Sequence, residues 1–336
     1  MQKLNSKNDA YDLLYATAPS LALGAAVETG LLWMLAEKPM KGKEIVQALK
    51  LPGKRGYYWL QVLEMLGILE SEPGGYAPSA LAREAFLVTR SQETWKHLVA
   101  DERERTACIS NLPQFLGEPG SLWAAQGLPA PRNYVEKMRN DPARAREFTR
   151  MLYELHQPLA DCLAERLDVD GVRRLLDVGG GSGVVSMALL RKYPELTAVV
   201  VDIETVCLAG REIAEENCFS DRITYHPMDL NHGDLPGNFD LVLKCDMFLF
   251  SERLFQQIWQ SLNSGGRLIL VDHFSPEENV PPSSLLRWSF LDSLNDPEVF
   301  IPTEQQVCTL LVQTGFQVSP DRYTLPDRRV ILQAKK

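Results

Sequence analysis

The sequence predicts an α/β fold in which a Rossmann-like sheet ends in an antiparallel hairpin and follows an N-terminal α-helical domain that contains a winged helix. Three observations support this fold class. From residue 173 onward, short apolar runs alternate with amphipathic helical stretches, which is typical of a parallel sheet with helices between its strands. A glycine-rich turn, residues 179–183, follows the first of these runs. Two late β-branched runs are joined by a short turn, so they must pair antiparallel.

The composition excludes several classes of protein. The chain of 336 residues is long enough for about two domains, and its net charge of -9 argues against a broad surface for nucleic acid or an anionic membrane. None of the six cysteines stands in a CxxC pair, which indicates reduced thiols in a cytoplasmic protein. The longest apolar region, residues 10–35, is interrupted by Asp12, Pro19 and Glu28, so we expect no membrane insertion.

Residues 1–100 are expected to form a helical dimerisation domain. Two helical stretches occupy residues 9–36, with breaks near residues 18–19 and at residues 29–30, next to a proline and a glycine. The small residues Ala22, Gly24, Ala25 and Ala26 would let another helix approach closely. We therefore interpret these stretches as buried interface helices.

Helix, turn, helix and hairpin follow one another in residues 43–78, an order typical of a winged helix. Winged helices commonly bind DNA, but here the second helix is basic only at its start, at Lys54 and Arg55, and the hairpin carries Glu70 and Glu72. DNA-binding helices place several Arg or Lys toward the groove. We therefore expect dimerisation or the covering of a substrate site, and no nucleic-acid partner. A ligand-sensing regulator is a less favoured alternative.

Residues 101–168 are expected to form a helical connector that contributes to the substrate pocket. Asp141 and Pro142 predict the start of a helix, because Asp caps free amides of the first turn and Pro fits its first position. We expect this helix to run to His156, and we expect Pro158 to kink or restart it.

Residues 169–336 are expected to hold the nucleotide-binding sheet. The alternating pattern predicts parallel strands with helices between them and a closing antiparallel pair. The expected strands are 175–178, 197–201, 223–225, 239–244, 267–272, 316–324 and 329–334. The expected helices are 184–192, 205–217, 252–262 with a cap at 264–266, 284–294, and one that begins in a capping box at Thr303.

The glycine-rich turn and the acids around it predict the ligand. A dinucleotide loop has the spacing G-x-G-x-x-G, whereas Gly179 and Gly181 belong to a G-x-G-x-G loop preceded by Asp177, which would repel a pyrophosphate. A ligand with an amine and a sulfonium but no phosphate suits that acid. Asp202, at the end of the next strand, can accept hydrogen bonds from ribose hydroxyls, and Asp229 can reach an adenine amine. We therefore expect S-adenosyl-L-methionine (SAM), with S-adenosyl-L-homocysteine (SAH) as the product.

The chain resembles the dimeric class I O-methyltransferases over nearly its whole length. This family includes plant caffeate and flavonoid enzymes, acetylserotonin methyltransferase, bacterial hydroxyneurosporene methyltransferases and the bacteriochlorophyll ring methyltransferase. The resemblance rests on the N-terminal winged helix, the loop 177–183, Asp202 and the segments 228–230, 239–244 and 265–272.

The resemblance implies a SAM-dependent methyltransferase of secondary metabolism in which the loop glycines approach SAM. It implies that Asp202 holds the ribose and that Asp229, Leu230 and Lys244 frame the adenine. It also implies a homodimer that forms through the N-terminal domain.

One segment departs from the O-methylating members of this family. They carry a catalytic His in Leu-Lys-x-x-x-His-Asp-Trp, whereas this chain has Phe248 at the position of the His, and the acid that supports the His is missing before Thr303. Positioning two reactants can by itself supply about 7–11 kcal/mol. We therefore expect transfer by proximity to an oxygen or ring carbon of a flat aromatic metabolite. The candidate pocket residues are Phe248, Phe250, Trp288, Leu291 and Asp292.

His156 is the best candidate for a replacement base, because in relatives its helix touches the methyl group; an ordinary core or surface His is the alternative. His273 is a weaker candidate. Asp246 and Asp292 lack the clustered spacing of metal ligands, so no metal is expected. Because the usual base is missing, a SAM-binding relative with decarboxylase-like or hydroxylase-like chemistry is the alternative function.

Overall fold

The computed structural model describes residues 4–127 and 134–336. The chain forms two compact units that meet in sequence between Ala107 and Cys108. Each unit has its own hydrophobic core. The helical connector that we expected over residues 101–168 therefore begins in the first unit and continues in the second.

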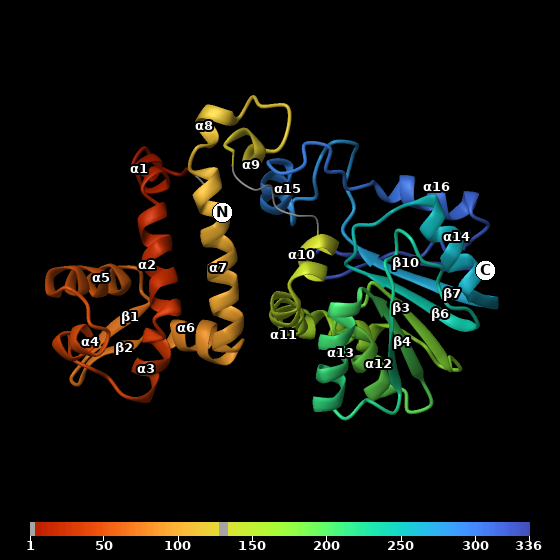
Figure 1. The fold of residues 1–336 in the computed structure, drawn as a ribbon, viewed down its shortest axis with the longest axis horizontal. Coiled ribbons are helices and arrows are strands. Elements are labelled where there is room, and N and C mark those ends of the chain that lie inside the picture. Colours follow the sequence, from red (N-terminus) through yellow and green to blue (C-terminus); the bar gives the residue numbers. More distant parts are fainter. Residues whose placement is uncertain (1–3, 128–133) are drawn as a thin grey trace. The chain divides into compact units, whose positions relative to one another are not determined.

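The first unit consists of helices and a two-stranded hairpin (Figure 1). Strands β1 (Leu69–Glu72) and β2 (Gly75–Pro78) pair antiparallel. The helical elements are α1 (Asp9–Leu14), α2 (Thr17–Glu28), α3 (Leu31–Glu37), α4 (Gly42–Ala48), α5 (Gly53–Met65), α6 (Ala80–Ala82), the π-helical turn η1 (Arg83–Val88) and α7 (Gln92–Ile109). The unit thus has the expected order of helix, turn, helix and hairpin, while its dimerisation role stays a prediction.

The apolar core of this unit forms where α3, α4 and α5 meet. It contains Leu31, Leu32 and Leu35 of α3, Ile45 of α4 and Leu60 of α5, all fully buried. The break that we expected near residues 18–19 lies at residues 15–16 instead. Pro19 is the third residue of α2, where the amide that it lacks would have no acceptor inside the helix.

Among the described residues, no single helix is long and apolar enough to cross a membrane. Helices α2 and α3 meet the criteria of length and composition only when they are taken together, and they bend by 58° at their junction. Ala26 of α2 and Leu31 of α3 both belong to the core of the first unit.

The second unit is built on one mixed sheet. Its strands are β3 (Arg174–Val178), β4 (Thr197–Asp202), β5 (Ile223–Pro227), β6 (Phe239–Cys245), β7 (Leu262–Asp272), β8 (Gln317–Val318), β9 (Tyr323–Thr324) and β10 (Val330–Lys335). Their order is β5-β4-β3-β6-β7-β10-β8, with β9 also paired to β10. Strands β3 to β7 run parallel, and β10 is antiparallel to its neighbours, which confirms the predicted parallel sheet with a closing antiparallel element.

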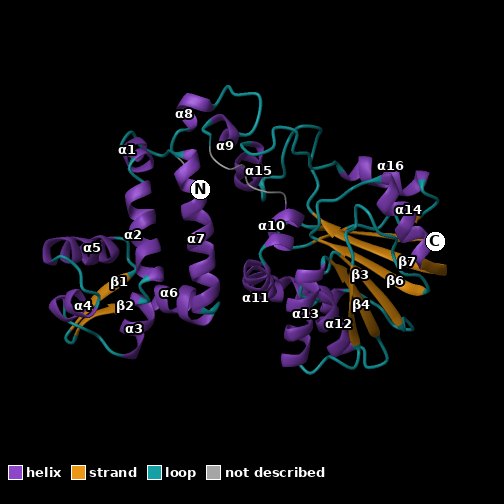
Figure 2. Ribbon diagram, viewed as in Figure 1, coloured by secondary structure: helices purple, strands orange, loops and turns teal. Residues whose placement is uncertain are grey.

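Helices cover both faces of this sheet (Figure 2). Helices α11 (Pro142–Arg166), α12 (Val184–Lys192) and α13 (Glu204–Glu216) pack on one face, and α14 (Glu252–Ser261) and α16 (Glu304–Gln313) pack on the other. The remaining helices are α8 (Leu112–Phe115), α9 (Leu122–Ala125), α10 (Tyr134–Asn140) and α15 (Leu286–Ser293). The sheet is therefore buried on both sides, and the carboxyl ends of its parallel strands meet at one edge, where ligands bind in such sheets.

Several local predictions are confirmed at this level. The α12 boundaries agree with the predicted 184–192. Asp141 caps α11 by accepting a hydrogen bond from the amide of Arg144 at 3.0 Å. Thr303 and Gln306 form the expected capping box of α16.

Two local predictions are wrong, and one of two alternatives is excluded. Of the kink or restart that we expected at Pro158, a restart does not occur, because Leu159, Ala160 and Leu163 just beyond it are buried in the core and α11 continues through them. The glycines at 265–266 do not cap α14, since the chain passes straight from Ser261 into β7. The late strand that we expected over 316–324 is split into β8 and β9 around Pro320, which has no amide hydrogen for a ladder.

Candidate active site

The glycine loop connects β3 to α12 at the centre of the sheet. Gly179 has φ +68°, and its amide donates to the carbonyl of Val201 at 2.8 Å, which ties the loop to β4. Gly181 has φ +56°, a conformation that side chains disfavour, and a Cβ placed on it would meet no atom within 4 Å. The loop therefore offers open space directly above the backbone of Gly181, as a closely approaching ligand requires.

Two buried carboxylates lie beneath this loop. Ser186 donates to Asp177 at 2.6 Å, while Asp202 accepts hydrogen bonds from the amides of Gly181 at 3.0 Å and Ile203 at 2.8 Å. Burial raises the pKa of Asp177 and the pKa of Asp202 to about 6 each, although these hydrogen bonds oppose the rise. Because these donors are a hydroxyl and backbone amides rather than basic side chains, a cationic ligand in the adjoining space would stabilise both charges.

A cavity opens beside the loop. It is lined by Thr149, Leu152, His156, Leu159, Asp177, Gly179, Gly180, Gly181, Ser182, Val184, Val185, Val206, Cys245 and Asp246. Open space above a glycine and two buried carboxylates beneath it fit the ammonium and sulfonium of SAM. The same cavity reaches His156 of α11, so the predicted donor loop and the predicted replacement base share one space.

Asp229 lies at a second cavity near the ends of β4 and β5. Arg139 of α10 also lines this cavity and donates to Asp229 at 2.8 Å. A backbone hydrogen bond from Asn231 and the ion pair with Arg139 hold the pKa of Asp229 below its usual value. Leu230 instead packs, half-buried, against the core on the α14 face of the sheet. Of the residues expected to frame the adenine, Asp229 is thus in a cavity and Leu230 is in the core.

Lys244 is fully buried in β6 and lies in neither cavity. Its Nζ is 3.2 Å from Asp272 and 3.9 Å from the centre of the Phe250 ring, and it donates to the carbonyl of Met247. Burial lowers the pKa of Lys244, and the charge of Asp272 opposes that shift. The structure therefore places Lys244 in an internal ion pair beneath the loop that follows β6.

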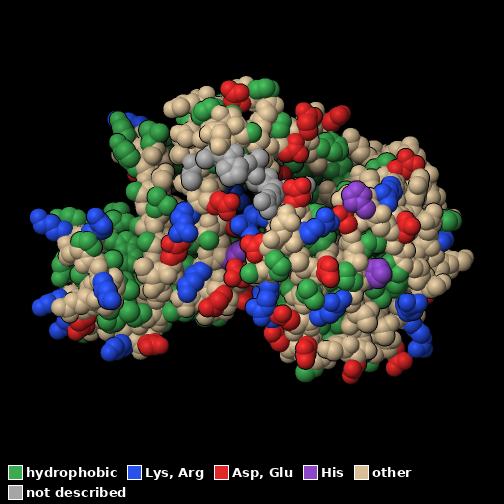
Figure 3. Space-filling model, viewed as in Figure 1, with side chains coloured by type: hydrophobic (Ala, Val, Ile, Leu, Met, Phe, Trp, Pro, Cys, Tyr) green, Lys and Arg blue, Asp and Glu red, His purple; other side chains and the backbone are tan. Residues whose placement is uncertain are grey.

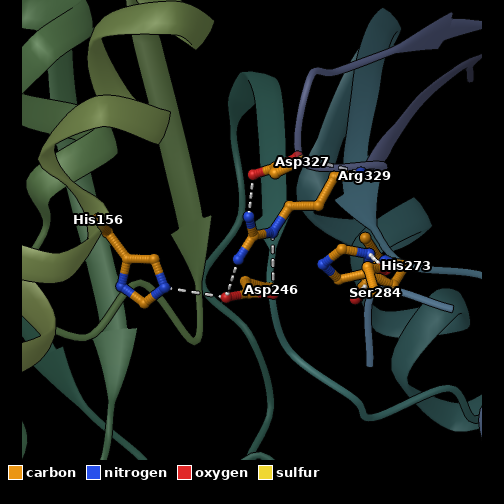
Figure 4. A network of polar contacts seen from close by, with 7 residues as sticks. His156, Asp246, His273, Ser284, Asp327 and Arg329 are labelled. Carbon is orange, nitrogen blue, oxygen red and sulfur yellow. Dashed lines mark hydrogen bonds and ion pairs between the residues drawn. The ribbon is translucent and has the colours of Figure 1, made fainter. Parts of the chain in front are cut away.

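Side chains from three separate elements form a polar network beside the first cavity (Figure 4). His156 Nε2 is 2.9 Å from Oδ2 of Asp246, just after β6. Arg329, just before β10, donates through Nε to Oδ1 at 3.1 Å and through Nη2 to Oδ2 at 2.9 Å of the same carboxylate. Asp327 pairs with the Nη1 of Arg329. Arg329 and Asp327 were not among the site residues that we expected from the sequence, and Asp246 was considered only as a metal ligand.

The expected acceptor residues are not all brought together. Phe248 stacks on Trp288 with ring centres 5.0 Å apart and an angle of 21° between the planes, and both rings remain partly exposed. Phe250 faces Lys244 instead. Leu291 packs against a small cluster around Leu122, and Asp292 is half-buried on the same helix, α15.

The other candidates for acid–base or metal chemistry receive little support. His273 is almost fully buried, and its Nδ1 is 3.1 Å from the hydroxyl of Ser284. Burial lowers the pKa of His273, which favours the neutral ring. Within residues 4–127 and 134–336, no group of three or more His, Cys, Asp or Glu side chains is arranged to hold a metal ion.

The family model of the O-methyltransferase domain matches residues 122–317, more than half of the chain. The chain belongs to this O-methyltransferase family. A 3-hydroxy-5-methyl-1-naphthoate 3-O-methyltransferase from Streptomyces sahachiroi is 29% identical over 81% of this chain and 78% of the relative. An L-tyrosine C(3)-methyltransferase from Streptomyces lavendulae is 26% identical over 80% of this chain and 75% of the relative. The solved structure of PigF with SAH has a TM-score of 0.82 at 20% identity and covers 98% of this chain and 100% of that one.

These comparisons confirm the resemblance drawn from the sequence motifs. Acetylserotonin and demethylspheroidene O-methyltransferases are also among the similar proteins. The protein is a SAM-dependent methyltransferase, and SAM is its methyl donor. The comparisons favour this function over the alternative of a SAM-binding relative with other chemistry.

Proposed function

We propose that this methyltransferase moves the methyl group of SAM to an oxygen or a ring carbon of a small aromatic or polycyclic metabolite, with His156 as the proton acceptor. One observation carries the proposal. A single cavity is lined both by the glycine loop and by the paired His156 and Asp246. Donor binding and proton acceptance can therefore occur side by side in the second unit.

The acids at the strand ends have distinct roles in this proposal. Asp177 lines the donor cavity and faces the donor with negative charge, and Asp202, beneath the loop, is positioned by the amide of Gly181 to hold the ribose. Asp229 binds the adenine amine in the second cavity, in exchange for its contact with Arg139. Lys244 and Leu230 are proposed to frame the adenine side of the site, Lys244 from its buried ion pair with Asp272 and Leu230 from its half-buried position beside the core.

His156 supplies the base that the family places at the position of Phe248. The Asp246 carboxylate can only accept hydrogen bonds, so Nε2 of His156 carries the ring proton and Nδ1 carries the lone pair. Bound SAM supplies an electrophilic methyl group, whose transfer leaves the electron pair of the broken bond on sulfur. Nδ1 of His156 takes the proton that the acceptor oxygen or ring carbon gives up as the new bond to methyl forms.

The acceptor is proposed to be flat and aromatic because Phe248 and Trp288 form a stacked pair with exposed edges. The names of two relatives point to the same class, a hydroxynaphthoate oxygen in one and position C(3) of tyrosine in the other. Both oxygen and carbon acceptors therefore belong to the proposal.

Incubation with methyl-labelled SAM and a panel of phenols, quinones and polycyclic aromatics tests this function. We expect the label in an aromatic product, with SAH formed in equal amount. Gly181→Val fills the open space of the donor loop and should abolish the reaction, whereas Gly237→Val adds the same side chain in open space with ordinary backbone geometry and should not. An acceptor that loses carbon dioxide or gains oxygen while the label stays on SAM would instead support the alternative chemistry.

The oligomer, the partners and the location are part of the same proposal. The N-terminal winged-helix domain is proposed to join two chains, because apolar side chains near its start, such as Leu14 of α1 and Tyr15 just after it, are more than 70% exposed. On the face drawn in Figure 3, basic and acidic side chains are interspersed, which supports the absence of a nucleic-acid partner. All six cysteines are free thiols, which supports a cytoplasmic location without membrane insertion.

A further inference from the structure

Arg329 holds Asp246 in a two-point contact that fixes the orientation of the carboxylate. The two bonds run from Nε to Oδ1 at 3.1 Å and from Nη2 to Oδ2 at 2.9 Å, so two donors of the guanidinium hold the two carboxylate oxygens. Only 14% of the Arg329 side chain and 20% of the Asp246 side chain are exposed. Asp327 holds the remaining arm of the guanidinium (Figure 4). This geometry leaves Asp246 little freedom to rotate.

The charge state of Asp246 follows from the same contacts. Burial by itself would raise the pKa of Asp246, but hydrogen bonds from His156 and Arg329 and the charge of Arg329 hold that pKa below its usual range. Asp246 is therefore a carboxylate at neutral pH and cannot donate a proton to the ring of His156. The ring must donate through Nε2.

The backbone of Asp246 adopts a conformation that costs free energy. Its φ is +52°, in the left-handed region that residues other than glycine seldom adopt. Its amide donates to the carbonyl of Val271 in β7 at 2.9 Å, which holds the turn in place after β6. Such backbone conformations persist where the surrounding structure requires them and are common at functional sites.

We propose that Asp246 and Arg329 are positioning residues that keep His156 in the tautomer with Nε2 protonated and Nδ1 free for proton acceptance. This inference rests on the proposed function of His156. It assigns a role to two residues outside the donor motifs, one of them in the closing antiparallel element of the sheet. This arrangement of His156, Asp246 and Arg329 differs from the family's conventional base because its side chains come from α11, the turn after β6 and the segment before β10.

The direct test is nitrogen NMR of the protein with ¹⁵N-labelled histidine, which needs no acceptor. His156→Gln identifies the His156 signals among the five histidines of the sequence. In the unsubstituted protein at mildly alkaline pH, we expect Nε2 protonated and Nδ1 unprotonated. Asp246→Asn should reverse this, because its amide group donates to Nε2 and the ring proton moves to Nδ1. An unchanged tautomer in Asp246→Asn would overturn the proposal.

Arg329→Gln tests the proposed role of Arg329 in positioning Asp246. We expect a mixture of His156 tautomers and a fall in kcat of about 10- to 100-fold, with the donor KM changed less than about threefold. Arg329→Lys restores the charge but not the fork and should recover only part of the activity. Arg328→Gln is the matched control, because Arg328 is the exposed neighbour and should leave the tautomer and kcat unchanged.

The outcomes separate this inference from the proposed function. If Arg329→Gln leaves both the tautomer and kcat unchanged, Arg329 has no positioning role. If the tautomer responds as expected but His156→Ala retains full turnover, His156 is not the base. Its positioning by Asp246 and Arg329 would then have no role in catalysis. Thermal unfolding of each variant shows whether lost activity comes from lost structure.

Discussion

His156 on α11 and Asp246 after β6 are 90 residues apart in the sequence, yet Nε2 of the imidazole lies 2.9 Å from Oδ2 of the carboxylate. The pair lines the donor cavity, so we expect His156→Ala to lower kcat by about 10²- to 10⁴-fold with an acceptor that must lose a proton. The affinity for SAH, measured by calorimetry, should change little. His226→Ala, which removes an exposed histidine of β5, is the control. Equal turnover in both variants would contradict the assignment of His156 as the base.

Binding of SAM should depend on pH through Asp177 and Asp202. Burial raises the pKa of each carboxyl to about 6, so each gains a proton as the pH falls through that value and ceases to attract a cation. We expect the Kd of SAM to rise below about pH 6 and to level off above about pH 7. SAH lacks the sulfonium charge, so its Kd should rise less. Calorimetric titrations of both ligands across this range test the difference, and a constant ratio of the two Kd values would contradict it.

Asp177→Asn should stabilise the donor-free protein at neutral pH while weakening its affinity for SAM. The folded-state pKa of about 6 lies above the ordinary value of 3.8 for an aspartate, so the folded protein loses stability as the pH rises between these values. Above about pH 7 the buried charge costs roughly 3 kcal/mol, which the amide avoids while still accepting from Ser186. We expect a higher Tm for Asp177→Asn and an unchanged Tm for the exposed control Asp170→Asn. A lower Tm for Asp177→Asn would show that the ionised form stabilises the free protein.

The stacked pair Phe248 and Trp288 should set the affinity for the acceptor. Such pairs contribute about 0.5–1.5 kcal/mol beyond the area that they bury, so Trp288→Ala should raise the acceptor KM by roughly threefold to tenfold. The Kd of SAH should stay constant. Tyr323→Ala removes an exposed aromatic ring from β9 and serves as the control. If the acceptor KM is the same in all three proteins, the acceptor does not contact this pair.

The N-terminal unit should form a homodimer through the exposed apolar face of α1 and α2. Leu14 is 77% exposed and Tyr15 is 71% exposed in the single chain, which leaves apolar surface for a partner. We expect sedimentation analysis to give a dimer at micromolar concentration. Leu14→Glu combined with Tyr15→Glu should shift the protein toward monomer, while Lys7→Glu nearby should not. A monomeric unsubstituted protein would contradict this part of the proposal.

The parts of the fold that follow from local patterns could be predicted from the sequence. The glycine loop, α12 and the capping box at Thr303 depend on residues within a few positions of one another. The parallel sheet follows from the alternation of strands and helices. The short turn before Arg329 likewise predicted the antiparallel end of the sheet, where β10 lies between β7 and β8.

The parts that depend on distant contacts could not be predicted in this way. Arg329 meets Asp246 across 83 residues because β10 inserts next to β7, and no local signal shows this pairing. The resemblance implies that Lys244 frames the adenine, and the structure adds that its side chain forms a buried ion pair with Asp272, a contact that no local pattern indicates. Pro158 was expected to kink or restart α11, and burial of the residues beyond it keeps the helix from restarting. In each of these cases tertiary packing overrides what the neighbouring residues favour.

A crystal structure with SAH and an acceptor identified in the labelling experiment tests the central claim most directly. We expect SAH in the cavity beside Gly181 and the reacting atom of the acceptor about 2.6–3.2 Å from Nδ1 of His156. The ring should still donate through Nε2 to Asp246. An acceptor whose reacting atom faces the SAH sulfur but lies far from His156 would contradict the account and leave proximity alone as the source of catalysis.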